Sequence, residues 1–462
     1  MFSLLHLDLN RMLSANLPDG RGLDSASLHE LVAGPGQAIR RKLEAMVLAD
    51  EGTFANTFRR PEIGRALELA ESFAGRFRNF VLVGIGGSTW GTLAIQAALC
   101  HSNWNEVDSV RGGCPRFYCL DNSDPDALSD LLEMIDPGET LVNVVSKSGT
   151  TAETAANFAT LAGRFRESIG DDWASHFVLT TDQGDGLLQR IGREHGMAVL
   201  DIPPKTGGRF SLLTAVGLFP AAILGLDVRA LVAGAEAITM AAIEEPLDRN
   251  RVLLASAASW LAYQQLATVN VVMPYARGLR YVANWYVQLW GESLGKKLDR
   301  QGRVVHSGST PLGALGAADQ HSLLQLFMEG PLDKLVTFVR VERFARSCPI
   351  ASAFPDHPEV AYLGGHDMAS LINAEQESTA EALRAAGRPS RTIELPEISA
   401  YWLGQLFQFL MLETFVNGEL MDLNTFDQPG VEAGKLLTYG AMGRPGFSHS
   451  ASTFNERMEF RD

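Results

Sequence analysis

The most informative group of reactive side chains lies near the C-terminus, in Phe426-Asp427-Gln428-Pro429-Gly430-Val431-Glu432-Ala433-Gly434-Lys435. On a helix, Gln428, Glu432 and Lys435 fall at i, i+4 and i+7, so all three side chains project from one face. An amide, a carboxylate and an ammonium on one face suit an oxygen-rich anionic ligand. The same pattern also fits a solvated amphipathic helix with one ion pair. This segment by itself leaves both interpretations open.

A second group of polar side chains is Ser146-Lys147-Ser148-Gly149-Thr150-Thr151, between an apolar run and a helical pattern. A helix N-terminus offers unpaired backbone N–H groups and the positive end of the helix dipole, and both attract phosphate. The hydroxyls and the lysine add donors, and Gly149 lets the main chain approach a ligand closely. An ordinary helix cap is the alternative, but one capping hydroxyl would suffice for it. The surplus of donors therefore favours a phosphate site.

A glycine-rich turn, Gly84-Ile85-Gly86-Gly87-Ser88-Thr89, also follows an apolar run. It resembles a dinucleotide-binding turn, but that fingerprint requires Gly or Ala where Thr89 stands, and the expected acid about 20 residues on is missing. The segment 291–296 is one residue too short for a nucleotide-binding P-loop. We therefore expect no nucleotide cofactor.

Three single residues have chemistry that their surroundings could adapt to catalysis: Arg209, Glu292 and His321. Glu292 lies beside a glycine and a tryptophan that can exclude water around a base, although a helix cap or surface loop is the commoner setting. Arg209 could stabilise a developing negative charge or form a structural ion pair. His321 begins an apolar helix, where it could cap the helix or move a proton.

The elements that must position these residues follow an α/β rhythm. Apolar runs alternate with helical patterns, first at 79–84, 116–120, 140–146, 176–181 and 197–202, and again at 268–273, 303–307, 335–341 and 391–395. This alternation predicts parallel sheets flanked by helices, with ligands at the carboxyl ends of the strands. We expect an α/β fold with two tandem doubly wound parallel-sheet domains. The predicted division is an N-terminal helical segment 1–60 packing on the larger domain, a first domain 61–235, a second, larger domain 236–437 and a C-terminal tail 438–462.

Composition narrows the class of protein. The chain has 462 residues, a net charge of -15 and only four cysteines, without CxxC spacing. The negative charge argues against nucleic acid or an anionic membrane as partners, and the cysteines argue against a metal site or a disulfide framework. The N-terminus is a poor signal peptide, and the most apolar run, 212–226, is too short to span a bilayer. We expect a cytoplasmic protein without a metal.

Five motifs, taken together and in this order, resemble the glucose-6-phosphate isomerase (phosphoglucose isomerase) family. They are Gly84-Ile85-Gly86-Gly87-Ser88, Ser146-Lys147-Ser148-Gly149-Thr150-Thr151-Ala152-Glu153-Thr154, Thr206-Gly207-Gly208-Arg209-Phe210-Ser211, Trp290-Gly291-Glu292-Ser293 and the C-terminal stretch that ends at Lys435. The resemblance covers about 60–437, and the length is closest to the short bacterial form. It implies that both predicted domains are of the SIS type, a fold that binds sugar phosphates.

The resemblance also implies an activity and a role for each matched residue. The expected reaction is the interconversion of D-glucose 6-phosphate and D-fructose 6-phosphate through a cis-enediol, in glycolysis and gluconeogenesis, without a cofactor. Glu292 would be the base and Arg209 would stabilise the charge. His321, supplied by the neighbouring subunit of a homodimer, and Lys435 would open the sugar ring. The substrate would be bound by Gly87, Ser88, Ser146, Lys147, Ser148, Thr150, Thr151, Glu153 and Gln428.

Other functions remain possible on the residues alone. A sugar-phosphate-sensing module would need the Ser/Thr loop but not Glu292, His321 and Lys435 together. A nicotinamide-dependent oxidoreductase is disfavoured by the imperfect glycine fingerprint. An isomerase that also accepts mannose 6-phosphate stays open, because the contacts that read the C2 configuration cannot be located from sequence.

Overall fold

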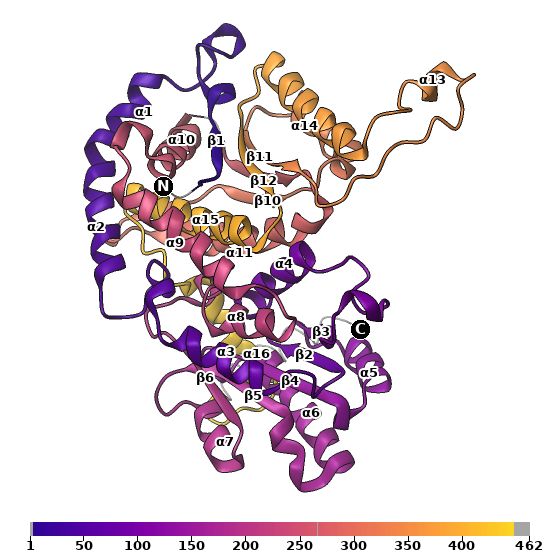
Figure 1. Cartoon of the computed structure of the whole chain (residues 1–462). Helices are drawn as coiled ribbons and strands as arrows, with labels where there is room; N and C mark the ends of the chain where they lie inside the picture. Colours follow the sequence, from indigo (N-terminus) through magenta and orange to yellow (C-terminus); the bar gives the residue numbers. More distant parts are fainter. Residues whose placement is uncertain (1–2, 266, 448–462) are drawn as a thin grey trace, which may run out of the picture.

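Two five-stranded sheets organise the protein, which is described here from a computed structural model covering residues 3–265 and 267–447 (Figure 1). Their strand orders are β3-β2-β4-β5-β6 and β1-β12-β11-β7-β10. The predicted α/β class with two sheet units is thereby confirmed. Of the predicted C-terminal tail, residues 448–462 lie outside the described part of the chain.

The first sheet is entirely parallel. Its strands are β2 (Asn79–Val83), β3 (Arg116–Leu120), β4 (Thr140–Val145), β5 (Phe177–Asp182) and β6 (Ala198–Ile202). Strands β2 and β4 are buried along their whole length because helices cover both faces, which explains their continuous apolar runs. The surrounding helices are α3 (Glu62–Ser72), α4 (Trp90–Leu99), α5 (Pro125–Met134), α6 (Ala152–Ile169), α7 (Leu187–His195) and α8 (Ala215–Ile223).

The second sheet is mixed, and here the sequence prediction needs correction. Strands β7 (Val269–Pro274), β10 (Thr310–Gly313), β11 (Lys334–Arg343) and β12 (Ser390–Glu397) are parallel, but β1 (His6–Asp8) joins β12 antiparallel at the edge. The predicted strand 303–307 forms instead a two-stranded antiparallel hairpin, β9 (Val304–Ser307) with β8 (Lys296–Leu298). Its residues are mostly exposed, so they could not occupy a sheet covered on both faces.

Long helices of the second unit include α9 (Val228–Glu244), α10 (Arg251–Gln265), α11 (Arg280–Leu294) and α15 (Ala400–Leu420). Helix α15 is buried over nearly its whole length. It lies so close to α9 that a Cβ at Gly234 would stand 1.9 Å from the Tyr401 carbonyl oxygen, which explains the glycine there. Helices α11 and α15 both contact α4, so they join the two sheet units.

The N-terminal segment packs mainly on the second unit through β1 and two helices, α1 (Ser25–Leu31) and α2 (Gln37–Leu48). The helices α12 (Leu324–Glu329), α13 (Pro358–Ala361), α14 (Met368–Ala385) and α16 (Glu432–Ala441) complete the described chain. Figure 1 shows α13 on an arm that extends away from the body of the molecule. No helix among the described residues is both long and apolar enough to cross a bilayer.

Candidate active site

The candidate site lies at the carboxyl edge of the first sheet. Strands β3 and β4 flank β2 on opposite sides, so the chain reverses its direction of winding at β2. Such a switch point opens a crevice beyond the strand ends, and ligands of open α/β sheets bind there. The glycine turn 84–89 follows β2, and the loop 146–151 follows β4. The turn 207–211 after β6 completes this edge.

Arg209 connects this edge to the rest of the site. It is buried, with 3 % of its surface exposed. Its Nε donates to the Ser293 Oγ at 2.8 Å, and one terminal nitrogen donates to the Glu292 Oε2 at 3.1 Å and to the Gln428 Oε1 at 2.9 Å. Burial lowers the pKa of Arg209, and the Glu292 carboxylate opposes that shift. One cation thus brings together the predicted base and the predicted amide ligand.

The segment that carries Gln428 is held by two buried cations. The other terminal nitrogen of Arg209 donates to the main-chain carbonyls of Thr425 and of Asp427, the latter at 3.0 Å. The Lys296 ammonium donates to the Asp427 carbonyl and, at 2.8 Å, to its carboxylate. Burial lowers the pKa of Lys296, while the bond to Asp427 counteracts it. These contacts explain how an irregular segment keeps a fixed position.

Glu292 lies near the end of α11 with both carboxylate oxygens engaged. Its Oε1 accepts from the Gln288 Nε2 at 3.2 Å, while Oε2 faces Arg209. The side chain still keeps 32 % of its surface exposed, so a ligand can reach it. Sequence analysis did not identify Gln288. Its i–4 spacing from Glu292 on a predicted helix was the signal that could have found it.

The glycine turn approaches both α11 and the turn at Arg209. Gly86 has φ of +59°, and a Cβ there would stand 2.8 Å from the Gln288 Nε2. A Cβ at Gly87 would stand 2.5 Å from the Gly208 carbonyl oxygen. Only glycine fits these contacts, and Ser88 follows directly in the same turn. The predicted residues Gly87 and Ser88 therefore lie beside Arg209.

The Ser/Thr loop forms a cradle before helix α6. The Ser146 Oγ lies 3.1 Å from the Thr151 Oγ1 and accepts from the Gly149 N–H at the same distance. The Ser148 Oγ accepts from the Thr150 N–H at 3.2 Å. These bonds curl the loop into a closed turn.

Helix α6 presents its N-terminus to this cradle. Thr151 occupies the N-cap position, yet no side chain of the described residues caps the helix there. The first N–H groups of α6 are thus free of side-chain partners, which favours the anion site over the ordinary cap. Glu153 lies in the first turn, and Lys147 lines a neighbouring cavity of about 540 Å³ together with Gly207.

The prediction that Gln428, Glu432 and Lys435 share one helical face is wrong. Gln428 precedes the 3₁₀ turn Pro429–Val431 with non-helical backbone, and α16 begins only at Glu432. Gln428 consequently contacts Arg209, whereas Lys435 pairs with Glu432 at 2.8 Å on an exposed surface. Among the described residues, no hydrogen bond or ion pair joins Lys435 to Glu292 or Arg209. Helix α16 does reach the Ser/Thr loop, since the Tyr439 hydroxyl lies 3.4 Å from the Thr150 carbonyl oxygen.

His321 and Glu292 of the same chain lie towards opposite ends of β10. Helix α11 runs antiparallel to β10: a Cβ at Gly313 would contact Ala283, and one at Gly291 would contact Pro311. At a helical rise of about 1.5 Å per residue, Glu292 is roughly 14 Å along the axis from Ala283.

The residues beyond β10 are fixed at that far end. The Gln320 amide donates to the Tyr275 hydroxyl at 2.7 Å, and Tyr275 directly follows β7. His321, the next residue after Gln320, is exposed there. The structure therefore does not bring His321 and Glu292 of one chain together.

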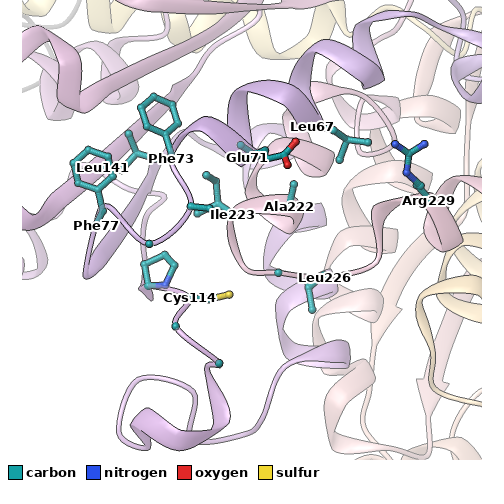
Figure 2. Close-up of a pocket in the computed structure, with 17 residues that line it drawn as sticks. Leu67, Glu71, Phe73, Phe77, Cys114, Leu141, Ala222, Ile223, Leu226 and Arg229 are labelled. Atoms are coloured by element: carbon teal, nitrogen blue, oxygen red, sulfur yellow. The ribbon is translucent and has the colours of Figure 1, made fainter.

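A second cavity, of about 520 Å³, lies at the amino edge of the first sheet, away from these residues. Figure 2 shows the Phe73 and Phe77 rings at one end and Arg229 at the other, with Glu71 between. None of the predicted site residues lines it. Among the described residues, no group of three or more His, Cys, Asp or Glu side chains is placed to hold a metal ion.

Comparison with known proteins gives consistent matches. Residues 66–457 match the family model described as phosphoglucose isomerase. A glucose-6-phosphate isomerase of Carboxydothermus hydrogenoformans is 43 % identical over 84 % of this chain and 83 % of its own. One of Rubrobacter xylanophilus is 45 % identical over 84 % and 89 %.

Two solved structures share the fold. A hypothetical protein from Thermus thermophilus superposes with a TM-score of 0.83 at 38 % identity, covering 95 % of this chain and 100 % of its own. A glucose-6-phosphate isomerase from Chlamydia trachomatis does so with a TM-score of 0.78 at 23 % identity, covering 97 % and 96 %.

Proposed function

This chain belongs to the phosphoglucose isomerase family, and we propose that it interconverts D-glucose 6-phosphate and D-fructose 6-phosphate through a cis-enediol, with Glu292 as the base. The observation that supports these roles is the convergence of Glu292 and Gln428 on Arg209. The reaction belongs to glycolysis and gluconeogenesis. A cytoplasmic location, which we also propose, suits the four free cysteines.

The proposed proton transfer needs one carboxylate and one cation. Glu292 takes the proton from C2 of the open-chain aldose and returns it to C1, while the proton of the C2 hydroxyl passes to the C1 carbonyl oxygen. Arg209 neutralises the carboxylate before transfer and the enediolate oxygens after it. The guanidinium is already fixed by four other groups, so it needs no rearrangement during the reaction.

The Ser/Thr loop is the proposed phosphate site. Its hydroxyls and the free N–H groups of α6 offer many donors in a small space, which a protein of net charge -15 needs in order to hold an anion. The residues proposed to hold the phosphate are Ser146, Lys147, Ser148, Thr150 and Thr151. Those proposed to hold or orient the sugar are Gly87, Ser88, Glu153 and Gln428.

The proposed active form is a homodimer. Because His321 lies at the far end of β10 from Glu292, a ring-opening histidine is best supplied by His321 of the partner subunit. Lys435 is proposed to assist it. The arm around α13 offers an apolar surface for such a contact, with Phe354 59 % and Tyr362 68 % exposed.

An NMR time course of fructose 6-phosphate in D₂O, with EDTA and without nucleotide, tests the function. We expect glucose 6-phosphate to appear up to equilibrium, with deuterium partly incorporated at C2. Mannose 6-phosphate appearing as well would widen the specificity. If the spectrum stays unchanged while the protein binds the sugar, a sensing module replaces the isomerase.

Mixed dimers test the shared site. Glu292→Gln and His321→Asn chains should each be nearly inactive alone. If His321 acts across the interface, unfolding and refolding them together creates hybrids with one intact site each. Random pairing then restores about a quarter of the parent activity. No recovery, with hybrids demonstrated by native mass spectrometry, would assign His321 to its own chain or to no site.

A further inference from the structure

Phe54 belongs to the segment before residues 66–457, yet its ring lies at the back of the candidate site. It is 1 % exposed, and its centroid is 4.9 Å from that of Phe210 and 6.0 Å from that of Phe426. Phe415 of α15 lies 5.7 Å from it. The Phe210 and Phe426 rings also touch one another, at 5.3 Å. We call Phe54, Phe210, Phe415 and Phe426 the phenylalanine cluster.

Two residues of this cluster are chain neighbours of Arg209 or of the residues that bind it. Phe210 is the residue after Arg209. Phe426 lies between Thr425 and Asp427, whose carbonyls accept from the guanidinium. Phe54 therefore packs on the chain neighbours of both hydrogen-bonding partners. It contacts Phe210, which follows the donor Arg209, and Phe426, which lies between the two residues whose carbonyls accept.

The Phe54 backbone is itself fixed. The Asn56 Nδ2, on a side chain 1 % exposed, lies within hydrogen-bonding distance of three main-chain carbonyls, those of Met46, Ala49 and Glu51, at 3.1, 2.9 and 3.0 Å. The Asn56 Oδ1 also accepts from the Thr53 N–H at 2.8 Å. From α15, the Gln408 amide donates to the Phe54 carbonyl at 3.3 Å. The ring is thus held in place from its own segment and from α15.

We propose that Phe54 is a positioning residue that keeps Arg209 aligned with Glu292 and Gln428. The inference rests on the proposed role of Arg209. A guanidinium is a rigid fork, so a shift of Phe210 against Phe426 misaligns several of its bonds at once. A displacement of about 1 Å at a reacting group can cost about 100-fold in rate. The N-terminal segment would then contribute to catalysis without touching the substrate.

Phe54→Leu compared with Phe80→Leu tests the proposal. Phe80 is equally buried, at 0 %, and also contacts two rings, but in the core of the first sheet. We expect a similar fall in Tm for both variants, a kcat about 10-fold or more lower only for Phe54→Leu, and an almost unchanged KM. A kcat equal to that of Phe80→Leu overturns the proposal. If Phe54→Leu does not fold, Phe54→Met replaces it.

A double-mutant cycle with Arg209→Lys separates this inference from the proposed function. If Phe54 acts through Arg209, the double variant loses about as much kcat as Arg209→Lys alone. If the kcat loss of the double variant equals the product of the two single losses, Phe54 acts independently of Arg209 and the proposal fails. Full activity of Arg209→Lys would defeat the proposed role of Arg209 itself. An impaired Arg209→Lys beside a normal Phe54→Leu would defeat only the inference about Phe54.

Discussion

Two buried arginines of this molecule each pair with a glutamate, but the two carboxylates have different surroundings. The Arg209 and Glu292 side chains are 2 % and 32 % exposed. Those of Arg391 and Glu413 are both 0 % exposed. The first pair lies at the carboxyl edge of the first sheet. The second lies between β12 and α15.

The Arg391–Glu413 pair is enclosed by polar side chains of the same core. The Arg391 Nη1 and the Ser259 Oγ donate to the Glu413 Oε1 at 2.6 and 2.8 Å, and the Arg391 Nε donates to the Thr337 Oγ1 at 2.9 Å. These residues come from two strands and two helices, so the pair fixes how those elements meet. A pair without access to solvent cannot act on a ligand. Glu292 is thus accessible to a ligand, whereas Glu413 is closed off and connects structural elements.

The largest expected effect is that of Glu292→Gln. Removing the carboxylate of the proposed base should lower kcat by about 10²–10⁴-fold or more, because the amide cannot accept the proton. Since Glu292 is partly exposed and Arg209 keeps its four other hydrogen-bond partners, Tm should fall less than in Glu413→Gln. Activity by NMR and Tm by circular dichroism check both parts. Near-normal turnover would mean that the Arg209–Glu292 pair is structural, like the Arg391–Glu413 pair.

Glu413→Gln should show the opposite profile. It leaves the Arg391 charge buried without its counterion, so unfolding free energy should fall by about 3–5 kcal/mol. The kcat per folded molecule should stay unchanged. Denaturant unfolding measures the loss, and replacing Arg391 by Met and Glu413 by Leu together should recover much of it. A large loss of kcat in fully folded Glu413→Gln would show that the Arg391–Glu413 pair takes part in catalysis.

Gln288→Met tests whether Gln288 keeps the Glu292 carboxylate oriented. It removes the donor to the Glu292 Oε1, and we expect about a tenfold lower kcat. Stability should hold, since the buried Gln288 Oε1 has no hydrogen-bond partner among the described residues. Gln376→Met is the matched control: Gln376 is fully buried with both of its polar atoms unpaired in the described chain, but it lies on α14. Equal kcat in both variants would contradict the prediction.

The smallest expected effect is that of Glu419, a paired carboxylate whose exposure is intermediate between those of Glu292 and Glu413. Burial raises its pKa, but hydrogen bonds from Arg300 and Lys42 outweigh this and leave the pKa below its ordinary 4.5. At a pH between the folded and the unfolded pKa of Glu419, the unfolded chain binds more protons than the folded one. The stabilisation is therefore present above about pH 4.5 and lost as pH falls through the folded pKa.

Glu419→Gln should accordingly lower stability at neutral pH by about 1 kcal/mol or less, because both cations are partly exposed. The difference from the parent should shrink towards pH 3. Tm measured across this range checks it. A constant difference at all pH values would mean that the charge of Glu419 contributes nothing.

The first sheet could be predicted almost completely from sequence, and the second only for β7, β11 and β12. Strands β2 and β4 are buried along their whole length and β5 over most of it, and these strands contain apolar runs that end at glycines or polar residues. Strand β10 has only four residues, including Pro311 and Gly313, and β1 has three, so neither produces a periodic pattern. The exposed β9 resembled a core strand because it contains two valines.

The candidate site shows a similar division. Loops and motifs contiguous in sequence, such as those at Arg209 and at Ser146–Thr151, were found from their residue types. Gln288 and Phe54 were not, because neither has an unusual local sequence and each depends on contacts between distant segments. The helical face expected for Gln428 and Lys435 failed because Pro429 and Gly430 delay the start of the helix.

Strand β1 ties residues 6–8 to residues 392–394, with the whole first sheet inserted between them in the chain. During synthesis on a ribosome, the first sheet can therefore close early, once β6 has emerged. The second sheet must wait for β12, and Phe54 must wait for Phe415 and Phe426. The contacts around Arg209 are thus completed among the last steps of folding, so a nascent chain should form the proposed phosphate site before it aligns the proposed catalytic residues.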